Sequence, residues 1–156
     1  MITVNDIGDR LEELVRAAFP EEEVHRELCP AGFTRPCNLI VLDECSVNVS
    51  LAPNLAELQP TFTITTFAET DEYYHSHLAE LHKRQAKVLA LFLPGFIKVG
   101  SRAPKVGKLK MGGGYDYDTV TVTFTITIDR AEFIEQAQTP TAENIETRLD
   151  IKYAGK

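Results

Sequence analysis

The stretch from Asp118 to Asp129, which reads DTVTVTFTITID, constrains the fold more than any other part of this 156-residue chain. Within it, valine, phenylalanine and isoleucine alternate strictly with threonine. Because successive side chains of a strand point to opposite faces, one face is wholly apolar and the other is wholly threonine. Most of these residues are β-branched, which suits a pleated backbone. The pattern predicts a strand about 33 Å long with an apolar face that needs a cover.

A long helix is the expected cover for this apolar face. Residues 71–93 form the one other segment of comparable length, and as a helix they would measure about 34 Å. Their apolar residues recur at helical spacing, with a cap expected at Thr70 or Asp71 and an end at Pro94-Gly95. The pattern predicts an α+β fold: an antiparallel or mixed β-sheet with an N-terminal helix and one long helix packed on one face.

Shorter segments complete the expected fold. An amphipathic helix begins after Thr3 and ends before Pro20, where the proline stops it. Strands are expected at 24–28, 37–49, 61–67 and 96–99, with a bulge or bend near 44–46. A loop or loose hairpin connection is expected at 52–60, a long glycine-rich loop at 100–114, and a last helical turn or two at 130–138. We therefore expect one domain over residues 1–138 and a C-terminal tail or arm over 139–156.

The composition fits an ordinary globular protein, with 44% apolar and 25% charged residues. No apolar run is long enough to span a membrane. The first residues lack the basic region and apolar core of a secretory signal, which predicts synthesis in the cytoplasm.

Three cysteines, Cys29, Cys37 and Cys45, form an odd number without C-x-x-C spacing. Buried or idle thiols are therefore favoured over a disulfide or a metal site.

No motif for catalysis or cofactor binding is complete. Glu72-x-x-His75 resembles half of a di-iron carboxylate site, but no second Glu-x-x-His exists. Gly107-Lys108 lacks the flanking residues of a phosphate-binding loop, and no G-x-S-x-G motif is present. We expect a protein that is not an enzyme, with no catalytic residue, no metal ligand and no cofactor.

The charge is unevenly placed on a chain whose net charge is −7. One acidic group lies in the N-terminal helix, and a basic group lies between residues 98 and 110. A head-to-tail subunit interface would join the two groups of neighbouring copies. Two alternatives remain open: a solvated run of charge, and a small-ligand or nucleic-acid binding module that uses the 98–114 loop. The candidate interface residues are Lys98, Arg102, Lys105, Lys108, Lys110, Asp6, Asp9, Glu12 and Glu13.

The order of elements resembles a known family. An acidic N-terminal helix and a short strand precede GFTRPCNLIVL at 32–42, and a helix precedes GGGYDYDTVTVTF at 112–124. This order, over about residues 1–130, resembles the tail terminators of bacteriophages and prophages, in the form found beside contractile tails.

The resemblance implies an α+β subunit that forms a hexameric ring on the head-proximal end of the tail tube. The ring stops tube polymerisation and offers a docking face to the head or neck. Its implied partners are further copies of itself, the tail tube and sheath proteins, and a head-completion or neck protein. DNA would pass through the lumen without specific recognition, and no membrane is involved. The protein would be found in the host cytoplasm during assembly and then in the virion or a phage-like particle. A head–tail connector (neck) subunit is the alternative within the same machinery.

Overall fold

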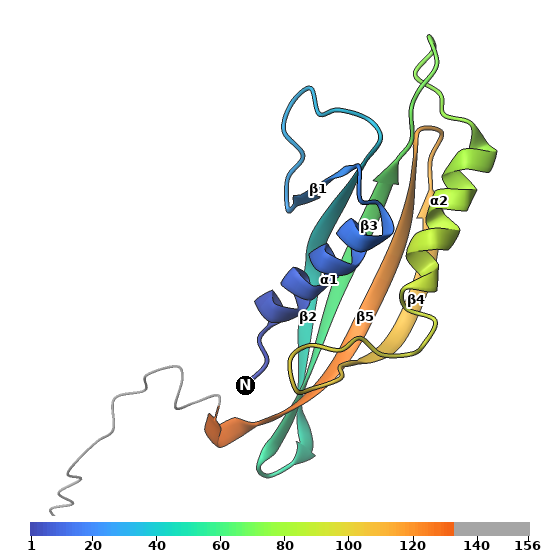
Figure 1. The fold of residues 1–156 in the computed structure, drawn as a ribbon. Coiled ribbons are helices and arrows are strands. Elements are labelled where there is room, and N and C mark those ends of the chain that lie inside the picture. Colours follow the sequence, from blue (N-terminus) through green and yellow to red (C-terminus); the bar gives the residue numbers. More distant parts are fainter. Residues whose placement is uncertain (133–156) are drawn as a thin grey trace, which may run out of the picture.

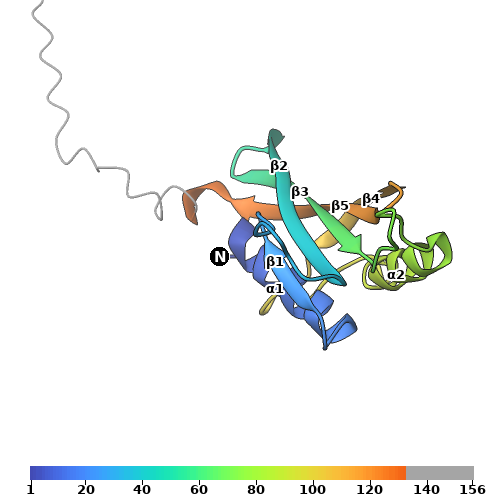
Figure 2. The same cartoon turned by 90° about the horizontal axis from the view of Figure 1, so that it is seen from above.

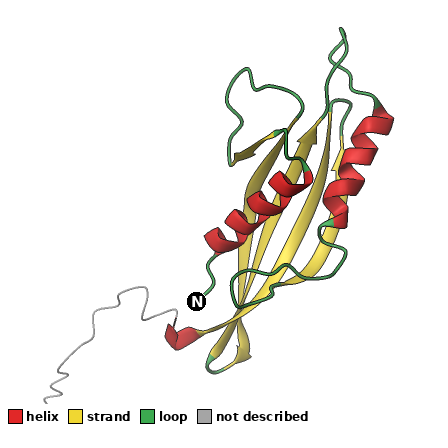
Figure 3. Ribbon diagram, in the orientation of Figure 1, coloured by secondary structure: helices red, strands yellow, loops and turns green. Residues whose placement is uncertain are grey.

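A computed structural model describes residues 1–132 of the chain (Figures 1 and 3). Its elements are α1 (Val4–Ala18), β1 (Glu23–Arg26), β2 (Cys37–Ala52), β3 (Leu55–Phe67), α2 (Leu78–Ala90), β4 (Lys105–Gly113) and β5 (Tyr117–Asp129). Residues 130–132 are helical. The rest of the turn expected at 130–138 and the tail expected at 139–156 lie outside the described residues.

The strands form one mixed sheet in the order β1-β2-β3-β5-β4. β1 runs parallel to β2, and the other neighbouring pairs are antiparallel. Figure 2 shows both helices on the same face of the sheet. α1 contacts β1 and β2, whereas α2 contacts β3 and β5. The expected α+β class, with a mixed sheet and helices on one face, is confirmed.

The pairing of β3 with β5 forms the centre of the sheet. Phe62 pairs with Val122 and Ile64 with Val120, and all four side chains are buried under the helices. Threonines pair on the opposite face, where the Oγ1 atoms of Thr61 and Thr123 lie 2.9 Å apart. The two-faced character predicted from the alternation is therefore confirmed for both strands.

The long helix expected at 71–93 is shorter than predicted. α2 has 13 residues and begins at Leu78, with His77 as an N-cap that makes no side-chain hydrogen bond. Asp71 caps a separate turn instead, because its carboxylate accepts the backbone N–H groups of Tyr73 and His75. At about 20 Å, α2 cannot cover the whole apolar face. α1 and the segment after α2, which buries Ile97 and Val99, cover the rest. No helix within residues 1–132 is long and apolar enough to cross a membrane.

The prediction of a glycine-rich loop at 100–114 is also wrong, because residues 105–113 form β4 and pair with β5. A register shift at Gly107 interrupts the alternation of β4, which hides the strand in the sequence. In place of a strand at 96–99, isolated bridges join Phe96 to Lys105 and Val99 to Arg102.

Three further boundaries differ from the expected ones. β3 already begins at Leu55, so the connection expected at 52–60 is a tight hairpin. The expected bulge lies slightly earlier than 44–46, between Leu42 and Glu44. β1 ends at Arg26 rather than residue 28, because Glu27 adopts a φ of 63° that breaks the strand.

We predict that Phe124→Ala will lower the free energy of unfolding by about 3–5 kcal/mol. Phe124 is fully buried, and its ring lies 6.0 Å from that of Phe92, just after α2, and 6.3 Å from that of Phe62. Urea denaturation measures the change. Thr125→Ala, on the opposite face of the same strand, is the control and should cost much less. A loss below about 1 kcal/mol for Phe124→Ala would contradict this packing.

Asp118 is a buried carboxyl at the start of β5. Its side chain is 4% exposed, and its Oδ2 atom has no hydrogen-bond partner among the described residues. Burial raises the pKa of Asp118, and the nearby His82 partly opposes that change. The pKa of Asp118 is therefore higher in the folded state than in the unfolded state. As the pH rises through the folded-state pKa and the carboxyl ionises, the free energy of unfolding falls.

Asp118→Asn should therefore raise the melting temperature at pH 7. The substitution removes the buried charge and leaves the volume of the side chain almost unchanged. The difference from the wild type should shrink as the pH falls toward the ordinary range of an aspartate, where the native carboxyl is also neutral. Thermal melts at several pH values measure it. Glu44→Gln, at an exposed carboxyl on β2, should show no comparable gain. A variant that is less stable than the wild type at pH 7 would contradict the prediction.

Candidate functional site

Three of the five predicted basic residues lie together on β4. Lys105, Lys108 and Lys110 are exposed and stand opposite Thr125, Thr123 and Thr121 of β5. All three therefore belong to the threonine face, which the helices leave uncovered. We call Lys105, Lys108 and Lys110 the lysine edge, because β4 is the last strand of the sheet. Within residues 1–132, none of the three forms an ion pair.

The other two basic residues are not part of this row. Lys98 is exposed in the segment between α2 and β4. Arg102 lies in the turn before β4, and its Nη1 atom donates to the carbonyl oxygen of Thr127. Lysines on an edge strand also have a plain structural use, since they discourage pairing between the sheets of different molecules.

The acidic residues of α1 already have partners in their own chain. Asp6 accepts the backbone N–H and the hydroxyl of Thr3, and these hydrogen bonds lower the pKa of Asp6. Glu12 and Glu13 pair with arginines of the same helix at 2.6 Å. Asp9 pairs with Arg26 of β1 at 3.1 Å, a contact that helical spacing cannot reveal. The acidic surface of α1 is therefore partly neutralised.

Some of the opposite charges also share one cleft. A cleft of about 370 Å³ lies between the start of α1 and the 99–102 turn. Its lining includes Asp6, Asp9 and Glu13 together with Arg102. Arg102 thus lies near the acidic residues of its own chain, whereas the lysine edge does not line this cleft.

The hairpin of β2 and β3 carries an exposed apolar surface that the sequence did not indicate. The strand expected at 37–49 included Val47 and Val49 without showing that this end stays exposed, and 52–60 was expected to be a loop. Val47, Val49 and Leu51 recur at every second position of β2 and are 50–58% exposed. Leu55, at the start of β3, is 36% exposed. In Figure 1 this hairpin extends beyond the ends of both helices. We call these four residues the apolar hairpin; clustered exposed apolar side chains are typical of interaction surfaces.

The GFTRPC segment, residues 32–37, packs over one end of the threonine face. The ring of Phe33 lies 5.0 Å from that of Phe67. The guanidinium of Arg35 lies over both rings and donates to the carbonyl oxygens of Ala68 and Asp116 and to the Asp116 carboxylate. These contacts join the segment to β3 and to the β4–β5 turn. Its most specific residues therefore have a clear structural role.

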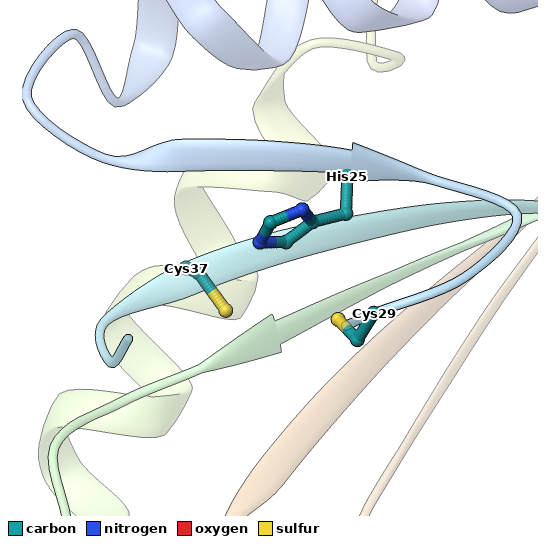
Figure 4. Close-up of side chains that lie close together, drawn as sticks. All are labelled: His25, Cys29 and Cys37. Carbon is teal, nitrogen blue, oxygen red and sulfur yellow. The ribbon is translucent and has the colours of Figure 1, made fainter. Parts of the chain in front are cut away.

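A thiol–imidazole cluster includes Cys37, the last residue of this segment. One ligand atom each of His25, Cys29 and Cys37 lies within 4.8 Å of the others, and Figure 4 shows the three side chains converging. Burial, followed by the proximity of Cys29, raises the pKa of Cys37 to about 12. Burial also raises the pKa of Cys29. Both thiols are therefore protonated near pH 7, which does not suit an activated nucleophile.

A further cleft, of about 1030 Å³, lies between Glu22 and the turn before α2. Its buried Arg84 is fully engaged: Nη1 and Nη2 donate to Glu22 at 2.6 and 2.5 Å, and Nε donates to Thr66. His75, which was expected on a helix, lies in the turn with its ring against Tyr115. Within this cleft, Arg84 and Glu22 therefore form a structural ion pair, and Arg84 is not available to a ligand.

No protein-family model matches the chain, and a search of curated proteins found no match.

Proposed function

We propose that this protein is a ring-forming tail terminator that caps the head-proximal end of a phage-type tail tube. The observation that carries the proposal is the apolar hairpin, whose valines and leucines remain half exposed in a single copy. A neighbouring subunit or the tube would cover them. The sequence resemblance through GFTRPC and GGGYDYDTVTVTF supplies the family, and with it the hexameric ring.

The placement of charge supports a head-to-tail contact between copies. The lysine edge belongs to the threonine face, whereas α1 lies on the opposite face of the sheet (Figure 2). Because the lysine edge and the acidic residues of α1 occupy different faces of one copy, a pairing between them must join two copies. Interfaces of this kind close into rings or grow into filaments. Closure of such a ring on the tube would leave no further site for tube subunits.

The lysine edge also supports a second candidate, contact with the phosphate backbone of nucleic acid. Three unpaired lysines in a row could meet phosphates. The net charge of −7 opposes this candidate for nucleic acid in general. A nucleic-acid contact would strengthen at low salt without any change in the mass of the protein alone.

The mass of the protein in solution tests the proposal. Light scattering over a range of protein and salt concentrations should show a ring-sized species. If the free protein is monomeric, preformed contractile-type tail tubes are added and their ends are viewed by electron microscopy. A protein that stays monomeric and leaves the tube ends bare would overturn the proposal.

We predict that reversing the lysine edge, as Lys105→Glu, Lys108→Glu and Lys110→Glu together, will impair assembly and leave the fold intact. All three side chains are exposed and unpaired, so their reversal costs the monomer little. The single variants Lys108→Glu and Lys83→Glu form a matched pair, because Lys83 is exposed on α2. Circular dichroism monitors folding and light scattering measures assembly. Equal assembly of the triple variant and the wild type would remove the lysine edge from the interface.

We predict that Val49→Lys will weaken self-association about tenfold or more. The expected size follows because burial of a valine contributes about 1.5–3 kcal/mol, and each 1.4 kcal/mol is a factor of ten in affinity. Asn54→Lys, at the exposed turn of the same hairpin, adds the same charge without removing an apolar group. Sedimentation velocity compares the two variants. Similar behaviour of both would show that the valine is not in the contact.

A further inference from the structure

We propose that His25, Cys29 and Cys37 form a binding site for Zn²⁺ on the threonine face of the sheet. Two sulfurs and an imidazole nitrogen lie within 4.8 Å of one another. The inference is independent of the proposed role in tail assembly.

The sheet register places two of these ligands on one face. In the parallel pair of β1 and β2, Glu23 stands opposite Cys37, and His25 stands opposite Leu39. Because alternate residues share a face, His25 and Cys37 both point away from α1. Cys37 is completely buried there, although it lies on the face that the helices leave uncovered. The segment between β1 and β2 therefore provides its cover.

The third ligand, Cys29, is brought to the cluster by a sharp turn of the chain after β1. Glu27 has a φ of 63°, and its backbone N–H donates to the carbonyl oxygen of Ile40 at 2.8 Å. This turn directs the chain back over the face, so that Cys29 reaches the other two side chains (Figure 4). The spacing of Cys29 and Cys37 in the sequence could not show this, because the approach depends on the turn and on the strand register.

The imidazole has an unused nitrogen at this place. His25 Nε2 is inaccessible to solvent and has no hydrogen-bond partner among the described residues. Glu23 Oε2 lies 3.3 Å from it, but without the geometry of a hydrogen bond. A buried polar atom without a partner is costly, so such an atom in a native fold calls for an explanation. A bound ion would satisfy it.

The spacing and the ligand types suit zinc. Zinc bonds of about 2.0–2.3 Å in a tetrahedron place neighbouring ligand atoms about 3.3–3.8 Å apart. From separations of up to 4.8 Å, the three ligand atoms need to approach one another by at most about 1.0–1.5 Å, a distance that side-chain rotations can supply. Thiolates with imidazole favour zinc over the hard ions magnesium and calcium. A fourth ligand would come from water or from Glu23, whose 65% exposed side chain lies 3.3 Å from His25 Nε2 but outside the cluster of the other three ligands.

Coordination would join two parts of the fold to β2. β1 is a four-residue edge strand, and residues 27–36 form the long connection to β2. An ion held by His25, Cys29 and Cys37 would join both to the start of β2. On binding, the two thiols would release their protons to solvent and become zinc thiolates. The site would be structural, because its ligands hold the chain together beside GFTRPC.

The test is metal analysis of the full chain, purified with a thiol reductant, loaded with Zn²⁺ and desalted. Elemental analysis should find one zinc per chain, and the loaded protein should melt at a higher temperature than the chelator-treated protein. Co²⁺ loading should give the visible absorption of a tetrahedral thiolate site. Cys29→Ser and His25→Ala should each lose the bound ion on desalting. Both positions are partly exposed, so these variants should still fold even if Cys37→Ser does not.

Cys45→Ser is the matched control, because Cys45 is a partly buried thiol outside the cluster. It should retain the ion and the rise in melting temperature. Absence of zinc from the reduced wild-type protein would overturn the proposal. So would equal zinc retention by Cys29→Ser and the wild type. A Cys29–Cys37 disulfide that takes up no zinc after reduction would assign the cluster to redox chemistry and would also overturn it.

Discussion

The pairing of β3 with β5 is the interaction on which the rest of the structure depends. It joins two strands that are each apolar on one side and threonine-rich on the other, in a register that keeps the two sides separate. A slip of one residue would turn the apolar side chains out of the core. The apolar side receives both helices through contacts such as that of Phe92 with Phe124. The threonine side needs no cover, because its hydroxyls bond across the strands, as at Thr63 and Thr121.

The uncovered threonine face brings together the features that have no role in the core. The lysine edge stands at one margin, on β4, and His25 and Cys37 stand at the other, on β1 and β2. Between them, at one end, Phe33 and Arg35 pack against Phe67. The helices complete the core on one side of the sheet, so the proposed contact of the lysine edge and the proposed metal site would both use the opposite face.

The sequence was most informative where one local pattern decided the structure. The alternation in 119–128 predicted β5, and the same pattern in 61–67 predicted the second half of β3. Prediction from the sequence failed where an irregularity in the pattern or a tertiary contact determined the local structure. The shift at Gly107 concealed β4, and the side-chain hydrogen bonds of Asp71 formed a turn where helical spacing predicted a helix. The pairing of Asp9 with Arg26 and the approach of Cys29 to Cys37 depend on the folded register, so residue spacing could not predict either.

Acidic residues of α1 already form ion pairs within their own chain. An interface between copies would therefore depend less on charge and more on apolar burial. Exposed ion pairs contribute about 0–1 kcal/mol each, and Asp9, Glu12 and Glu13 already have arginine partners. Apolar burial contributes about 25 cal/mol per Å², so the apolar hairpin would supply most of the free energy of association. The unpaired lysine edge would act mainly on orientation and encounter rate, as interfacial charges generally do. Added salt should therefore slow assembly more than it weakens the assembled contact, since screening acts on exposed charges and leaves apolar burial intact.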